Sequence, residues 1–191
     1  RLFNLHGTRL PENRGGGGFS WQIMIGNRFG FCVLHLVDGG VDTGALVKVD
    51  EFLYSTTCRI PKDFREIYLA KNINFVMDFI EEFRVEEKEI QLIRQSEYFS
   101  SYWPRLNTDL NAWIDWSVTP EQLERFICAF DDPYDGAQTT LNGEVVCLKT
   151  VSLSQQDGVF HPFQIGIIYR LGKTWACICV NGSSLIVEEV I

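Results

Sequence analysis

The 191-residue sequence lacks the features that would mark a membrane, metal or phosphate-loop protein. It has no run of 18 apolar residues and no basic-then-apolar leader, so we expect a cytoplasmic protein without a membrane segment. Its six cysteines are scattered and form no Cys-x-x-Cys pair, so we expect reduced core thiols and no metal. The glycine run at residues 15–18 is not followed by Lys and Ser or Thr, which excludes a Walker-type loop there.

Basic residues are scarce toward the end of the chain. From Ile127 onward there are three basic and seven acidic residues, within a formal net charge of −8. Contacts of Lys and Arg with phosphates supply most of the affinity of a protein for nucleic acid. The charge therefore disfavours a nucleic-acid partner and favours a small-molecule substrate.

Against these absences, an amide, an imidazole and a carboxylate stand in two glycine-marked segments. Side chains alternate in an extended segment, so Asn4 and His6 are expected on one face. His6 titrates near neutral pH and can accept a proton, Asn4 can donate an amide N–H, and Asp42 would favour the charged imidazole. A structural histidine and a turn aspartate are the alternative interpretation. Their joint occurrence favours acyl transfer to an amine, which needs a base and donors for the oxyanion.

Four segments carry a family resemblance, at residues 4–15, 37–44, 114–116 and 130–137. In this order and at this separation they resemble the formyltransferases that use N10-formyltetrahydrofolate, and most closely the sugar N-formyltransferases. The resemblance implies that Asn4, His6 and Asp42 are catalytic and that N10-formyltetrahydrofolate is the co-substrate, with no metal. Gly7 and Thr8 depart from the Pro-Ser that is commoner in the family.

Further site residues follow from the same resemblance and from loop chemistry, since backbone groups can bind a pterin and glycine permits close approach. The residues expected at the folate are Leu10, Pro11, Asp38, Gly39 and Gly40. Thr8, Arg14 and Gly15 are expected at the acceptor, where Arg14 and free loop amides would suit a diphosphate.

The resemblance also implies an α/β fold, the C-terminal part of a Rossmann-like formyltransferase domain followed by a small β-rich domain. We expect the end of the catalytic domain at residues 1–97, a crossing segment and helix at 98–130, and the β-rich domain at 131–191. About 90 residues of βα units would precede Arg1 in a complete domain.

Local patterns predict the helices and strands of the first part of the chain. We expect an apolar helix at 19–25, a buried strand at 29–37 with His35 as a hydrogen-bonded core residue, and a strand at 45–54. A long helix should open at Ile60-Pro61, with a core-facing stripe of apolar residues. That stripe comprises Leu69, Ile73, Val76, Ile80 and Phe83.

The last third predicts one helix and several strands. Thr119, Pro120 and Gln122 form a helix start, followed by a buried face of Leu123, Phe126, Ile127 and Phe130. Strands are expected at 144–153, 163–170, 174–180 and 183–191, with Asn181-Gly182 as a two-residue hairpin turn.

We therefore expect formyl transfer to the amine of a nucleotide-linked amino sugar, with a nucleotide sugar as partner and a homodimer left open. Three alternatives remain. Methionyl-tRNA formyltransferase is disfavoured by charge, a formyltetrahydrofolate hydrolase would use water in place of the amine, and the chain could be a non-catalytic fragment or interaction module.

Overall fold

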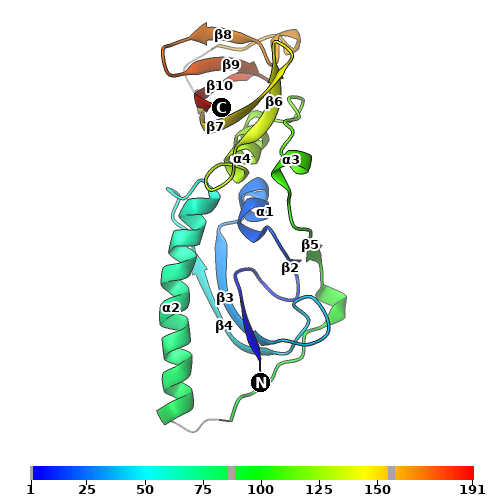
Figure 1. The fold of residues 1–191 in the computed structure, drawn as a ribbon, viewed down its shortest axis with the longest axis vertical. Coiled ribbons are helices and arrows are strands. Elements are labelled where there is room, and N and C mark those ends of the chain that lie inside the picture. Colours follow the sequence, from blue (N-terminus) through cyan, green and yellow to red (C-terminus); the bar gives the residue numbers. More distant parts are fainter. Residues whose placement is uncertain (1, 86–88, 155–157) are drawn as a thin grey trace. The chain divides into compact units, whose positions relative to one another are not determined.

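The computed structural model describes residues 2–85, 89–154 and 158–191. The chain divides into two compact units (Figure 1). Unit 1 comprises residues 1–18, 28–58 and 63–105, and unit 2 comprises residues 19–27, 59–62 and 106–191. The predicted α/β class is confirmed. The predicted division at residues 97 and 130 stays a prediction.

Unit 1 is built on a three-stranded antiparallel sheet of order β1-β3-β4, with bounds Phe3–His6, Phe29–Leu36 and Leu46–Leu53. β3 is the central strand and is buried along nearly its whole length, as its apolar run predicts. Two short strands, β2 (Arg14–Gly15) and β5 (Tyr102–Trp103), pair in parallel, and a 3-10 helix, η1 (Glu97–Phe99), precedes β5.

The two faces of β3 pack against different apolar clusters. Phe31 and Val33 pack with Leu10 on one face. Cys32 and Leu34 pack with Phe75 of helix α2 (Pro61–Val85) on the other. The face that carries Val33 also carries His35, because side chains two positions apart on a strand point the same way.

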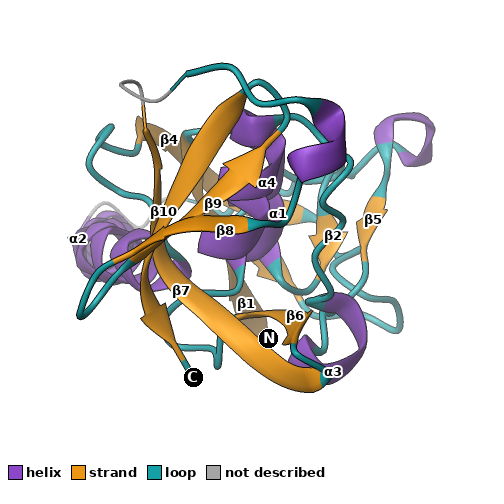
Figure 2. Ribbon diagram, turned by 90° about the horizontal axis from the view of Figure 1, so that it is seen from above, coloured by secondary structure: helices purple, strands orange, loops and turns teal. Residues whose placement is uncertain are grey.

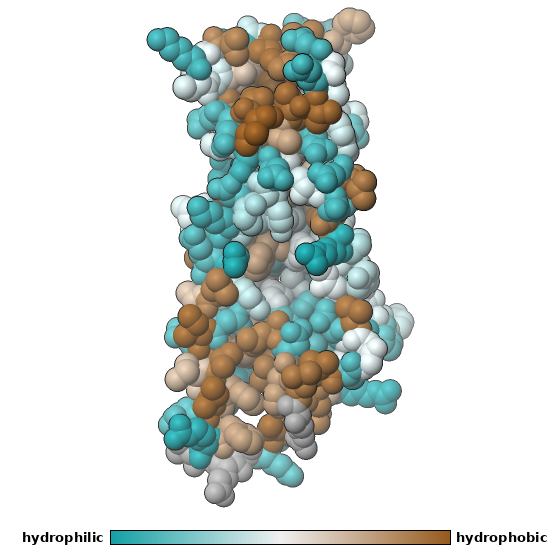
Figure 3. Space-filling view, in the orientation of Figure 1, coloured by the Kyte–Doolittle hydropathy of each residue, from teal (hydrophilic) through white to brown (hydrophobic). Residues whose placement is uncertain are grey.

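The predicted buried stripe of α2 is wrong, although the helix itself is confirmed. Leu69, Ile73 and Phe83 are 48%, 65% and 53% exposed, and Ile80 is exposed as well. The buried face instead carries Phe64, Asn72 and Phe75, with Val76 partly buried. Each step along a helix turns the side chain by about 100°, so one residue of offset separates a buried face from an exposed one. Figure 3 shows that apolar side chains reach the molecular surface.

Unit 2 contains a helix whose start and buried face follow the sequence. Helix α4 (Pro120–Ala129) begins with a complete capping box between Thr119 and Gln122, and it buries Leu123 and Ile127. Two shorter helices are α1 (Gly18–Ile25), as predicted, and α3 (Thr108–Asn111). The Ser20 hydroxyl of α1 donates to the Ala129 carbonyl at 2.8 Å and ties the two helices together.

A five-stranded antiparallel sheet of order β6-β7-β10-β9-β8 completes unit 2 (Figure 2). The bounds are Ala137–Leu141 for β6, Glu144–Ser154 for β7, Ile168–Leu171 for β8, Ala176–Val180 for β9 and Ser183–Val190 for β10. The Asn181-Gly182 hairpin is confirmed by the pairing of Ser183 with Val180.

Two predictions for this sheet need correction. The strand expected at 163–170 forms only in its second half, because Pro162 opens a 3-10 helix, η2 (Pro162–Gln164), and His161 caps that helix. β6 was not predicted. It forms a hairpin with β7 through Asn142 and Gly143, whose φ angles of 54° and 89° match a turn that needs two left-handed residues.

All six cysteines are free thiols in the structure. No helix in the described ranges combines the length and the hydropathy of a membrane-spanning segment.

Candidate active site

Asn4, His6 and His35 meet on one face of the unit 1 sheet. The antiparallel register places Asn4 directly opposite His35 and His6 opposite Val33. Directly opposite residues in such a pair share a face, so the register brings His35 beside Asn4. The two imidazole centroids lie 6.2 Å apart. The residues expected to be catalytic on β1 are thus joined by a second histidine.

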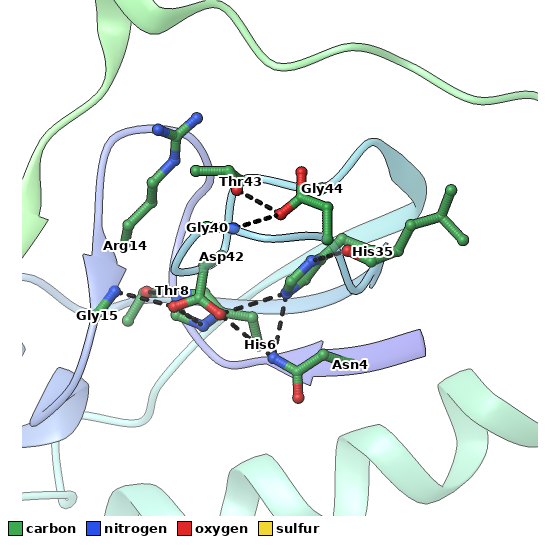
Figure 4. A network of polar contacts seen from close by, with 12 residues as sticks. Asn4, His6, Thr8, Arg14, Gly15, His35, Gly40, Asp42, Thr43 and Gly44 are labelled. Carbon is green, nitrogen blue, oxygen red and sulfur yellow. Dashed lines mark hydrogen bonds and ion pairs between the residues drawn. The ribbon is translucent and has the colours of Figure 1, made fainter. Parts of the chain in front are cut away.

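Asp42 arrives from the loop between β3 and β4 and contacts all three of these side chains (Figure 4). Its Oδ1 accepts a hydrogen bond from Asn4 Nδ2 at 3.3 Å and lies 3.5 Å from His35 Nε2. Its Oδ2 accepts the Gly15 backbone N–H at 2.9 Å and lies 3.5 Å from His6 Nδ1. The carboxylate therefore connects both strands with the glycine loop.

The contacts of His6 indicate where its proton lies. His6 Nε2 is 2.8 Å from the Asn13 carbonyl oxygen and 2.6 Å from Thr8 Oγ1, and the Thr8 hydroxyl also donates to Asn13 at 2.7 Å. Because a carbonyl oxygen only accepts, this arrangement favours a proton on Nε2. The free lone pair of a neutral His6 is then on Nδ1, the atom that faces Asp42.

Burial favours the neutral form of His6. Desolvation lowers the pKa of His6 below its usual 6.5 and outweighs the Asn13 hydrogen bond and the Asp42 charge, which both raise it; His35 lowers it further. Asp42 thus favours the charged imidazole, as expected from the sequence, but burial is the larger effect. A neutral imidazole at neutral pH is the form that can accept a proton.

His35 is buried and hydrogen-bonded as predicted, but its partners were not anticipated. The residue is 2% exposed, its ring Nδ1 lies 2.9 Å from the Leu36 carbonyl oxygen, and its Nε2 lies 3.1 Å from Asn4 Nδ2. The signal in the sequence was a single polar residue inside an apolar strand. Its connection to Asn4 depends on strand register, which the sequence does not display.

The loop between Asp38 and Gly44 is closed by its own side chains. Asp38 Oδ1 accepts the Thr43 hydroxyl at 2.5 Å and the Gly40 backbone N–H at 3.1 Å, and these hydrogen bonds lower the pKa of Asp38. Gly39 and Gly40 are exposed. The loop therefore presents backbone groups at the surface, as a folate-binding loop would require.

Two glycines are required by the packing of this site. A Cβ atom on Gly44 would lie 1.7 Å from the Leu36 carbonyl oxygen. Gly15 has φ of +102°, and a Cβ there would lie 2.3 Å from the Trp103 carbonyl oxygen. Any other residue would displace the backbone that carries Asp42 or the N–H that binds it.

Arg14, expected at the acceptor, is 6% exposed and engaged inside unit 1. Its guanidinium donates to Gln95 Oε1 at 3.0 and 3.2 Å and to both Glu97 oxygens at 2.9 Å. Gln95 in turn donates to the carbonyl oxygens of Asp42 and Gly44 at 2.8 and 2.7 Å. Gln95 was missed, because no local pattern marks it. These contacts favour a role for Arg14 in holding the Asp42 loop.

The Leu10-Pro11 turn lies at the edge of the same site. Leu10 is 7% exposed and packs against Phe31 and Val33, whereas Pro11 is only partly buried. Thr8 is 4% exposed, and its hydroxyl is hydrogen-bonded to His6 Nε2 and to the Asn13 carbonyl oxygen. Among the described residues, no group of three or more His, Cys, Asp or Glu side chains is placed to hold a metal ion.

The arrangement can transfer a proton beside a polar side chain, the Asn4 carboxamide, that can bind the reacting group. A proton taken up by His6 Nδ1 would lie between the ring and the Asp42 carboxylate, which stabilises the positive charge. Asn4 supplies an exposed carboxamide two residues away on the same strand. Base, orienting carboxylate and polar anchor are the set that acyl transfer to an amine needs.

Comparison with known proteins places these residues in context. Residues 108–191 match the family model described as formyl transferase, C-terminal domain. The methionyl-tRNA formyltransferase of Geobacter metallireducens is 27% identical to this chain over 194 residues, which cover 98% of the chain and 57% of that protein. The chain thus spans little more than half the length of this relative.

Two solved structures share the fold. An N-formyltransferase from Helicobacter canadensis, in complex with folinic acid and dTDP-3-aminofucose, has a TM-score of 0.72 at 19% identity and covers 98% of this chain and 65% of its own. HypX from Aquifex aeolicus, in complex with tetrahydrofolic acid, also has a TM-score of 0.72, at 21% identity, covering 98% and 31%. The chain is therefore similar to a methionyl-tRNA formyltransferase in sequence and to these two structures in fold over almost its whole length, and residues 108–191 match the model of the formyl transferase C-terminal domain.

Proposed function

We propose that the complete protein transfers a formyl group from N10-formyltetrahydrofolate to the amine of a nucleotide-linked amino sugar. The observation that carries this proposal is the convergence of Asn4, His6 and Asp42, with the Asp42 carboxylate 3.5 Å from His6 Nδ1 and hydrogen-bonded to Asn4.

In this reaction the acceptor amine attacks the formyl carbon, and the bond from that carbon to N10 of the folate breaks. The attacking nitrogen loses a proton, which His6 accepts at Nδ1 and which finally replaces the formyl group on N10. Asp42 holds the resulting imidazolium, and Asn4 hydrogen-bonds the reacting groups. Atoms and charge balance without a metal or an oxidant.

Folate is the proposed donor because the related structures named above contain folinic acid and tetrahydrofolic acid. Its expected position is beside Leu10, Pro11, Asp38, Gly39 and Gly40. Pro11 and the two glycines have accessible surface, and the closed Asp38 loop would offer a preformed backbone edge to a pterin. Leu10 would support this surface from the core.

Charge supports a small acceptor. Of the three basic residues from Ile127 onward, Lys149 is 7% exposed and hydrogen-bonded to Asp132 and to the Tyr134 carbonyl oxygen. Burial lowers the pKa of Lys149, but its carboxylate partners outweigh this and raise it. Only Arg170 and Lys173 are then left at the surface of that segment, too few for an extended contact with RNA phosphates.

The acceptor site itself is proposed at the glycine loop. Gly15 lies next to Asp42 and opens the run that leads into α1. Thr8 and Arg14 were expected to bind the acceptor directly. Both side chains are buried and hydrogen-bonded inside the protein. Their direct contact with the acceptor stays a prediction.

Methionyl-tRNA is the second candidate acceptor, favoured by the methionyl-tRNA formyltransferase from Geobacter metallireducens. The test is incubation of the complete protein with N10-formyltetrahydrofolate and each acceptor in turn. We expect formylation of a dTDP-linked amino sugar and a weak response to salt, because only two phosphates would be contacted. Formyl-methionyl-tRNA without any formylated sugar would refute the proposed acceptor. Formate release without either product would identify a hydrolase.

A further inference from the structure

We propose that His35 is a positioning residue that holds the Asn4 carboxamide with its carbonyl oxygen toward the substrate. Asn4 would then act on the reacting amine as a hydrogen-bond acceptor. This inference deepens the proposed function and rests on it for its kinetic consequence. Its structural part is independent of that function.

The first step is the proton on His35. His35 Nδ1 lies 2.9 Å from the Leu36 carbonyl oxygen. A carbonyl oxygen only accepts, so Nδ1 must carry the hydrogen of a neutral ring. The lone pair of neutral His35 is therefore on Nε2, the atom that lies 3.1 Å from Asn4 Nδ2.

The second step is the orientation of Asn4. Its two amide hydrogens have two acceptors, His35 Nε2 at 3.1 Å and Asp42 Oδ1 at 3.3 Å. Turning the carboxamide over would set the Asn4 oxygen against a lone pair and a carboxylate, which is repulsive. Two acceptors on one side therefore select a single orientation.

The third step is what this leaves for a substrate. The Asn4 oxygen points away from His35 and Asp42 (Figure 4), and none of the described residues donates a hydrogen bond to it. Asn4 is exposed, whereas His35 is 2% exposed. A substrate thus meets an acceptor oxygen, and both amide hydrogens are already engaged. This differs from the donor role that the sequence suggested for Asn4.

An acceptor at this point suits the proposed reaction. An amine nitrogen that attacks a carbonyl needs its lone pair directed at carbon and its hydrogens directed elsewhere. The Asn4 oxygen can bind one N–H while His6 accepts the proton that leaves. His35 Nε2 lies 3.1 Å from Asn4 Nδ2 and 3.5 Å from Asp42 Oδ1, and the effect of His35 on turnover is assigned to its contact with Asn4.

The kinetic test uses three variants of the complete protein. His35→Leu removes the acceptor for Asn4, and His35→Gln restores one through its side-chain oxygen. Leu34→Val is the matched control, since it lies on the opposite face of β3. We expect His35→Leu to lower kcat about tenfold, the contribution of one ordinary hydrogen bond. KM for the folate should not change, and kcat should recover in His35→Gln and remain normal in Leu34→Val.

A double-mutant cycle separates positioning from general structural support. If His35 acts through Asn4, adding His35→Leu to Asn4→Ala should lower kcat no further. An equal loss in both backgrounds would overturn the proposal, as would a folded His35→Gln variant that is as slow as His35→Leu.

A spectroscopic test is independent of formyl transfer. In the 15N-labelled complete protein, the side-chain NH2 signal of Asn4, assigned from its loss in Asn4→Ala, should be protected from solvent exchange. Protection should persist in His35→Gln and Leu34→Val and vanish in His35→Leu. Unprotected Asn4 hydrogens in the unmodified protein would overturn the inference. An inactive protein with protected hydrogens would instead refute the proposed function alone.

Discussion

The two units use their buried polar groups differently. In unit 1 the buried His35, Thr8 and Arg14 belong to networks that end at Asp42 or His6. In unit 2 the buried Ser20, Asp131 and Lys149 instead bond to groups of that unit, namely the Ala129 carbonyl oxygen, the Thr150 N–H and Asp132. A buried polar group costs free energy unless it is hydrogen-bonded. Unit 1 therefore uses its buried polar groups to hold the candidate site, and unit 2 uses its own to join its helices and strands.

The helices show the same contrast. α4 buries Leu123, at 1% exposed, as its periodicity predicts. α2 exposes Leu69 and Ile73. Both helices carry apolar residues at helical spacing, so periodicity locates an apolar face but does not show what packs against it.

The largest expected effect tests whether chemistry is confined to unit 1. His6→Ala and Asp42→Ala should each lower turnover by a hundredfold or more, on the order of a general-base contribution. Folate affinity should be largely unchanged, since neither side chain is expected at the pterin. His161→Ala in unit 2 is the control and should retain full turnover. Normal turnover in either unit 1 variant, measured in a formyl-transfer assay, would refute the role assigned to it.

The next effect compares the two helices. Leu123→Ala should lower the free energy of unfolding by about 3 kcal/mol, because it empties a fully buried site. Leu69→Ala removes the same atoms from a side chain that is 48% exposed, so the loss should stay below about 1 kcal/mol. Denaturant titration measures both. Equal losses would mean that the apolar stripe of α2 is covered in the complete protein.

A glycine pair tests how tightly the Asp42 loop is built. Gly44→Ala should lower the free energy of unfolding by about 2 kcal/mol or more, because its Cβ would overlap the Leu36 carbonyl. Gly39→Ala is the matched control in the same loop. It has no atom within 4 Å of the added carbon, and should change stability by less than about 0.5 kcal/mol. Thermal unfolding of the two variants should therefore differ clearly.

A smaller effect concerns the start of α4 in unit 2. Thr119→Ala removes the hydroxyl that accepts the Gln122 N–H and should cost about 1 kcal/mol. Thr119→Ser keeps that hydroxyl and should cost much less. Both variants should keep wild-type turnover if unit 2 contributes packing alone. A loss of turnover in folded Thr119→Ala would break the comparison.

The smallest effect is on pH dependence. Burial lowers the pKa of His6, so the acid limb of the kcat/KM profile should lie below pH 6.5. Because the Asp42 charge raises the pKa of His6, Asp42→Asn should move that limb to still lower pH in the remaining activity. An acid limb that moves upward in Asp42→Asn would contradict this account.

The lowered pKa of His6 also affects stability. An unfolded histidine takes up protons from about pH 6.5 downward, so the stability that neutral His6 contributes is complete above that pH and is lost as the pH falls below it.

The sequence by itself determined the local features. Alternation along an extended segment placed Asn4 and His6 on one face, the capping box located the start of α4, and the apolar run located β3. These features depend on neighbours within a few residues, so a single chain displays them. The resemblance of the glycine-marked loops to formyltransferases was likewise visible in short stretches of sequence.

Only the tertiary structure decided which distant residues meet. The register of β1 against β3 joined His35 to Asn4, and the Gln95 amide, 53 residues from Asp42, connected Arg14 to the Asp42 loop. The exposed face of α2 was likewise decided by what packs against it. Strand register and burial depend on hydrogen bonds and contacts between segments far apart in the chain. The preferences of individual residues do not determine strand register or burial, which are set only when distant segments pack together.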